Sequence, residues 1–132
     1  MLGLDLNRHT RAHLLRAAQE GIVFALIYGL EIIRGMGTSV GTVRAGSANM
    51  FRSSLFAGAF ATLAGARVEL YDTDGSQGAA RGAGIGAGLF TAKDAFRGLE
   101  QKGAVEPDRA AAGAWRAAYE RWRKALAAQL PG

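Results

Sequence analysis

The sequence contains no cysteine and only two prolines among its 132 residues. The absence of cysteine excludes disulfide bonds and thiolate chemistry. The most apolar stretch, residues 21–33, is too short to span a bilayer and contains Glu31. No secretory signal peptide is recognisable. We therefore expect a cytoplasmic chain with no membrane partner, forming one domain or part of one.

Acidic residues are missing from a long central stretch, since none occurs between Glu31 and Glu69. Arginines do occur there, and the formal net charge of the whole chain is +5. A locally basic loop region would suit an anionic ligand such as a nucleotide. Nucleic acid is an alternative, but no RNA-binding motif or interleaving of aromatic and basic residues accompanies the arginines. A solvated arginine surface is the simpler interpretation.

Short β-branched runs separated by loops and helices organise the middle of the chain. The runs Ser39–Val43 and Arg67–Tyr71 predict strands, each followed by a loop and a helix. The helix between them should cover about Ser54–Leu63, with Ser53 as its cap. This order is typical of a parallel α/β unit, whose ligands bind at the carboxyl ends of the strands. That edge holds residues 44–49 and 72–77.

Three more helices are expected from periodicity and composition. The first covers about residues 11–34 and begins after Thr10. The second runs from the turn at Asp74 to about residue 92 and is rich in glycine, which indicates tight packing or a bound ligand. The third covers about residues 110–130 and should dock through its aromatic side chains. We expect residues 92–102 to continue the helix before them or to form a connector.

No motif for catalysis is evident from the residues alone. His9 and His13 have metal-ligand spacing on a helix, but no third ligand lies near them, so a structural or capping role is favoured. A turn explains Asp72 and Asp74 more simply than a metal site does. The glycine-rich segment lacks the dinucleotide-binding spacing, and no phosphate-binding G-K-[ST] sequence occurs.

Several segments resemble the last part of an FGGY-family carbohydrate kinase, most closely of the xylulose kinase type. They are LNRHTRAHLLRAAQEGIVFAL, VRAGSANMF, LFAGAFATLAGARVELYDTDGSQGAARGAGIGAG, EPD and AYERWRKAL. The resemblance implies an α/β fold: an incomplete actin-like, ribonuclease-H-like ATPase domain with short parallel strands covered by long helices. Residues 1–132 would be part of the C-terminal, ATP-binding-side domain of such a kinase, with the N-terminal sugar-binding domain absent.

The resemblance also implies a binding site. In that family a small-residue loop after a strand holds the adenosine of ATP, and the matching positions are Ala45, Gly46, Ser47 and Asn49. The family more often has consecutive glycines where Arg44 and Ala45 stand. Its catalytic aspartate and phosphate-binding loops precede the matching segment, so no catalytic residue and no metal ligand is assigned. ATP is the implied cofactor, with Mg²⁺ in the complete enzyme.

The function implied is that of the adenosine-binding part of an ATP-dependent kinase for a pentulose such as D-xylulose, inactive alone. The alternatives are a non-catalytic interaction module on the same fold and a basic nucleic-acid-binding protein. In this fold the strand Ser39–Val43 would lack a neighbour and become an open edge. The first long helix would expose residues such as Ile22, Leu26 or Ile33. We therefore expect self-association.

Overall fold

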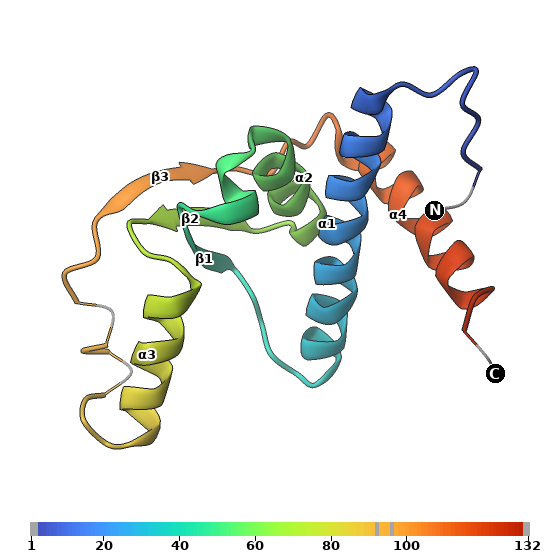
Figure 1. Cartoon of the computed structure of the whole chain (residues 1–132). Coiled ribbons are helices and arrows are strands. Elements are labelled where there is room, and N and C mark those ends of the chain that lie inside the picture. The colour runs from blue at the N-terminus through green and yellow to red at the C-terminus, as the bar shows by residue number, and fades with distance from the viewer. Residues whose placement is uncertain (1–2, 92, 96, 131–132) are drawn as a thin grey trace.

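A small mixed sheet forms the centre of the chain, with three helices gathered at one end and a fourth standing apart at the other (Figure 1). The computed structural model describes residues 3–91, 93–95 and 97–130. In chain order the elements are α1 (Arg11–Gly35), β1 (Thr42–Gly46), the 3₁₀ turn η1 (Asn49–Arg52), α2 (Ser54–Ala64), β2 (Arg67–Tyr71), α3 (Gly75–Gly86), β3 (Gln101–Val105) and α4 (Ala112–Ala127). Among these residues no helix is long and apolar enough to cross a membrane.

The sheet has the strand order β1-β2-β3. β1 and β2 are parallel, with Thr42 opposite Arg67 and Gly46 opposite Tyr71. This pair confirms the predicted parallel α/β unit, and β2 has the predicted bounds. β3 is antiparallel to β2. Residues 92–102 were expected to form a helix or a connector, which was wrong for residues 101 and 102, because β3 begins there. Pairing with β2 holds residues 101–105 extended despite their low β-propensity.

The first strand lies three residues later than predicted. Ser39–Val43 was expected from its β-branched residues, whereas the strand covers Thr42–Gly46. The ladder with β2 continues through Arg44 and Ala45 to Gly46. Pairing across the sheet therefore decides the bounds of this strand, and local propensity does not.

The core lies where α1, α2, α4 and β2 meet. Its largest fully buried side chains are Val23 and Ile27 of α1, Phe56 of α2, Val68 of β2 and Tyr119 of α4. The predicted docking of the last helix through its aromatic residues is confirmed: the ring of Phe24 lies 6.5 Å from Trp115, 5.8 Å from Tyr119 and 6.0 Å from Trp122.

A polar cluster ties α1 and α4 together. The carboxylate of Glu31 on α1 accepts a hydrogen bond from the hydroxyl of Tyr119 at 2.8 Å. It also accepts from Arg116 at 3.3 Å and from Arg123 at 3.5 Å. Glu31, the acid that interrupts the apolar stretch of residues 21–33, thus anchors α4, because three donors from one helix converge on its carboxylate.

Both histidines have the structural or capping role that was predicted, His13 in the first turn of α1 and His9 in the turn before that helix. Nδ1 of His13 accepts a hydrogen bond from the backbone N–H of Thr10 at 3.1 Å. Nδ1 of His9 accepts from the backbone N–H of Asp5 at 3.0 Å. Each ring therefore has a partner within the chain, and these partners give both residues a structural role.

The glycine-rich helix α3 is shorter than predicted, ending at Gly86 and not near residue 92. Gly88 has a φ of +73°, and the N–H of Leu89 donates to the carbonyl of Gly84 at 2.9 Å. This is a helix-ending motif that favours glycine, because the left-handed conformation is strained for other residues. Phe90 then folds back so closely that a Cβ on Gly84 would overlap its ring.

Part of the predicted exposure is confirmed. β1 is an edge strand, paired with β2 alone in the described sheet. On α1, Ile22 is 44%, Leu26 45% and Ile33 43% exposed. The molecule thus presents an open strand edge and apolar residues of a long helix to its surroundings.

Candidate functional site

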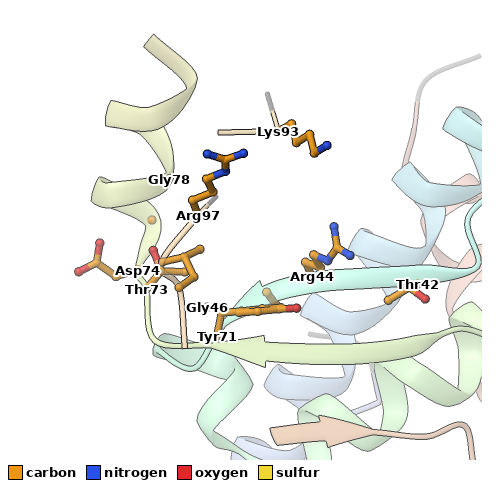
Figure 2. Close-up of a pocket in the computed structure, with 12 residues that line it drawn as sticks. Thr42, Arg44, Gly46, Tyr71, Thr73, Asp74, Gly78, Lys93 and Arg97 are labelled. Carbon is orange, nitrogen blue, oxygen red and sulfur yellow. The ribbon is translucent and has the colours of Figure 1, made fainter. Parts of the chain in front are cut away.

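A cavity of about 850 Å³ opens at the carboxyl ends of β1 and β2 (Figure 2). Its walls come from four parts of the chain: β1, the end of β2, the first turn of α3, and the segment between α3 and β3. The lining residues are Thr42, Arg44, Ala45, Gly46, Tyr71, Thr73, Asp74, Gly75, Gly78, Lys93, Arg97 and Leu99. Its place agrees with the rule that ligands of parallel α/β units bind beyond the strand ends.

The strand ends are held together by a close backbone crossing. The N–H of Ser47 donates to the carbonyl of Tyr71 at 2.7 Å, which extends the pairing of β1 and β2 by one bond. Beyond it the chain after β2 crosses over Gly46, where a Cβ would overlap the carbonyl oxygen of Thr73. Only a residue without a Cβ fits there while the backbone keeps its course.

Replacing Gly46 with alanine should therefore destabilise the chain by about 1–3 kcal/mol, the usual cost of forcing atoms into an occupied space. The contacting atom is backbone, so relief requires movement of the turn that forms the cavity wall. Gly41→Ala is the matched control, because nothing lies within 4 Å of its added Cβ. Urea unfolding of both variants measures the difference. If Gly46→Ala were as stable as Gly41→Ala, the turn at Thr73 would be able to move without a loss of stability.

Positive side chains outnumber negative ones around the opening. Arg44, Lys93 and Arg97 line the cavity, with Asp74 as the one lining carboxylate among the described residues. The Nε of Arg44 donates to Glu69 at 3.2 Å, and this hydrogen bond raises the pKa of Arg44 further. In turn, the hydroxyl of Tyr71 and then Arg44 lower the pKa of Glu69. The Arg44–Glu69 pair therefore keeps both of its charges at any physiological pH.

Asp74 has a structural task at the start of α3. Its carboxylate accepts from the backbone N–H of Gln77 at 2.9 Å and from the hydroxyl of Ser76 at 2.7 Å. The backbone bond with Gln77 is the main cause of a lowered pKa. Figure 2 shows the carboxylate directed away from the opening. These contacts agree with the turn interpretation of Asp74, and a lowered pKa makes it a poor general base.

The predicted site residues divide into two groups. Ala45 and Gly46 line the cavity, as does the start of the glycine-rich helix, through Gly75 and Gly78. Ser47 and Asn49 are not lining residues. Asn49 has a φ of +51° and begins η1, so it turns the chain away from the end of β1.

Sequence reasoning missed the wall opposite the strands. Lys93, Arg97 and Leu99 reach the cavity from the segment between α3 and β3. The two cations spaced four residues apart were visible, but a chain expected to continue as a helix would not return to the sheet edge. The overlooked β3 is what brings this segment back to the opening.

The cavity suits binding more than catalysis. A tyrosine ring, a leucine, an alanine and small glycines offer flat or apolar surface, and the cations surround it. This combination fits a ligand with a planar group and an anionic group, such as ATP. The part of the chain that the structure describes holds no cluster of three histidine or acidic residues that could bind a metal ion.

Comparisons with known proteins show similarity to sugar kinases. No protein-family model matches the chain. The L-xylulose/3-keto-L-gulonate kinase of Escherichia coli (strain K12) is 33% identical over 124 residues, which are 91% of this chain and 25% of that enzyme. The structure matches the xylulose kinases of Rhodospirillum rubrum (TM-score 0.73, 26% identity) and Brucella ovis (TM-score 0.74, 25% identity). Each match covers 96% of this chain and 26% of the other.

The chain thus spans about a quarter of the length of its relatives. It has the actin-like ATPase fold of xylulose kinase structures within that part. The resemblance noted in the sequence is confirmed: the chain is similar, in sequence and in structure, to one segment of sugar kinases of the xylulose kinase type.

Proposed function

We propose that residues 1–132 act as the ATP-binding-side part of the C-terminal domain of a carbohydrate kinase, and that they hold the adenosine of ATP. The observation that carries this proposal is the cavity at the end of β1 and β2, where Ala45 and Gly46 face the first turn of α3. The similarity to sugar kinases supports the reaction class. A pentulose such as D-xylulose is the proposed acceptor, and the cytoplasm the proposed location.

The lining residues have separate roles in such a site. The ring of Tyr71 and the flat backbone at Gly75 and Gly78 would contact the planar base, because glycine leaves room for its face. ATP, when bound, supplies the phosphoryl group. Transfer of that group depends on positioned metal ions and charged groups. The described residues offer cations but no cluster of histidine or acidic side chains that could position a metal ion, so the isolated chain is proposed to be inactive.

The proposal is tested by blocking the cavity without disturbing the fold. At Gly78 nothing lies within 4 Å of an added Cβ, so Gly78→Leu should place its side chain in the cavity. Calorimetry should show ATP binding no tighter than about micromolar, or −8 kcal/mol, in the unaltered chain. The Gly78→Leu substitution should abolish that binding, because the new side chain occupies the space of the base.

Gly82→Leu is the matched control for this experiment. Gly82 lies one turn further along α3, its Cβ position is equally open, and it does not line the cavity. Both substitutions add a helix-favouring side chain, so neither should unfold α3. Loss of binding in both variants, or in neither, would place the nucleotide elsewhere.

A further inference from the structure

We propose that Glu69 is a positioning residue of this cavity: its carboxylate holds the ring of Tyr71 as a flat wall against which a planar group can lie. This role rests on the proposed function and adds to it a residue that does not itself line the cavity. Glu69 lies on β2, directly opposite Arg44 of β1. A cross-strand ion pair alone would make it a residue that stabilises the sheet. Its contact with the ring gives it the further task.

One oxygen of Glu69 binds two side chains of the cavity wall. Its Oε2 accepts from the hydroxyl of Tyr71 at 2.9 Å and from Nε of Arg44 at 3.2 Å. Tyr71 and Arg44 both line the cavity. Residues two apart in a strand share one face, so the ring of Tyr71 lies back along β2 when its hydroxyl reaches Glu69. Figure 2 shows the ring edge-on along the strands, with its hydroxyl on the side of Arg44.

The backbone of Tyr71 is fixed, so the hydroxyl bond acts on the freedom that remains. The carbonyl of Tyr71 accepts from the N–H of Ser47 at 2.7 Å and from the N–H of Thr73 at 2.8 Å. The residue opposite on β1 is Gly46, which has no side chain to pack against the ring. The remaining motion is rotation about the side-chain bonds, which normally samples several staggered positions. The bond to Glu69 selects the position in which the ring lies along the sheet.

Burial and charge suit Glu69 to this task. Its side chain is 19% exposed, whereas that of Arg44 is 72% exposed. The hydrogen bond from Tyr71, followed by that from Arg44, lowers the pKa of Glu69, so the acceptor stays ionised at neutral pH. The other oxygen, Oε1, lies 3.8 Å from Nε of Arg67, which also pairs with Glu106. The two oxygens therefore have separate partners, and Arg67 can be removed without touching the bond to Tyr71.

The first test needs no ligand. NMR of the whole chain should show cross-peaks between the ring protons of Tyr71 and the side chain of Arg44, and Glu69→Gln should keep them because it retains an acceptor oxygen. Glu69→Ala should lose them, because the hydroxyl then has lost this acceptor. Arg67→Ala is the matched control and should keep them, because it removes the partner of Oε1 and leaves both bonds to Oε2. Cross-peaks that persist in Glu69→Ala would overturn the proposal.

The second test measures the binding of adenosine by NMR titration, with urea unfolding to show that each variant is folded. Adenosine carries no charge, so the release of Arg44 should matter little. Glu69→Ala and Tyr71→Phe should each bind it about three- to tenfold more weakly, the change that one hydrogen bond of ordinary net strength can cause. The double variant should bind no more weakly than either, because both substitutions remove the same bond. Glu69→Gln and Arg67→Ala should bind adenosine as the unaltered chain does.

The outcomes separate the role of Glu69 from the proposed function. Additive losses in the double variant, or an equal loss in Arg67→Ala, would show that the charges on the sheet are responsible and not the bond to Tyr71. If adenosine binds equally well to every variant, the positioning role is overturned while the nucleotide site stands. If it binds to none, the unaltered chain included, the proposed function fails, and the cross-peaks alone decide whether Glu69 fixes the ring.

Discussion

Replacing Tyr119 with alanine should lower the free energy of unfolding by about 3–5 kcal/mol, as is typical when a buried aromatic side chain is removed. Tyr119 has no exposed surface and packs 5.8 Å from the ring of Phe24 and 6.0 Å from that of Trp122. A domain of this size is stable by only about 5–15 kcal/mol. Because the loss is a large share of that total, we expect most of α4 to detach from the core. Denaturant unfolding followed by tryptophan fluorescence measures the loss.

Tyr119→Phe separates the ring from its hydroxyl. The phenylalanine keeps the packing and loses only the 2.8 Å hydrogen bond to Glu31, a change of about 1 kcal/mol. Glu31 would still be held by Arg116 and Arg123. If the alanine and phenylalanine variants were equally unstable, the hydroxyl and not the buried ring would be what anchors α4.

The stability of the unaltered chain relative to Tyr119→Phe should also depend on pH. Burial, followed by the neighbouring Glu31, raises the pKa of Tyr119 above its ordinary value. In the unfolded chain a tyrosine ionises near pH 10, as in model peptides, where its pKa is about 10. The folded chain therefore retains this proton when the unfolded chain loses it, and the stability due to Tyr119 is complete below about pH 10 and falls above it. The difference in stability between the unaltered chain and Tyr119→Phe should shrink in that range.

A second large effect is expected in solution: the chain should self-associate. β1 is an open strand edge, whose N–H and C=O groups can pair with another chain. On α1, Leu15 is 55%, Ile22 44% and Leu26 45% exposed. The net charge of +5 opposes association but is modest for this size. Light scattering should show a mass above the 13.8 kDa of one chain that rises with concentration.

Two surfaces remain as causes of association, the strand edge and the helix face. A sheet of only two strands would have been a third cause, but β3 completes a sheet of three. Leu26→Lys should therefore restore the monomer if the helix face is responsible, and Thr42→Lys if the strand edge is. Leu89→Lys is the control, because it changes an apolar residue, 76% exposed, away from both surfaces. A monomer at every concentration in the unaltered chain would contradict the prediction.

Local sequence signals predicted the bounds of those elements whose ends are determined by residues within or next to them. β2 has its predicted bounds because Val68 and Leu70 alternate with polar residues. α2 begins where Ser53 accepts from the N–H of Phe56, at 3.4 Å, and ends near Gly65 as predicted. Caps and alternation act within a few residues, so they can be recognised in the sequence alone.

Pairing between distant segments could not be predicted in the same way. β3 has a glycine and two polar residues among its five, and it is extended because β2 lies beside it. The site shares this limit. The resemblance predicted Ala45 and Gly46, whereas Lys93 and Arg97 line the cavity only because β3 returns the chain to the sheet.

The isolation of α3 has a consequence for how the cavity takes a ligand. Within this helix only Gly84 is buried, and Figure 1 shows α3 standing clear of the other helices. A helix with so few apolar contacts opens locally at a small free energy, well below that of global unfolding. A ligand that bridges β1 and the first turn of α3 must therefore order that helix as it binds. Part of its interaction energy offsets this loss of conformational entropy, and the first ligand bound leaves a more rigid surface for any later partner.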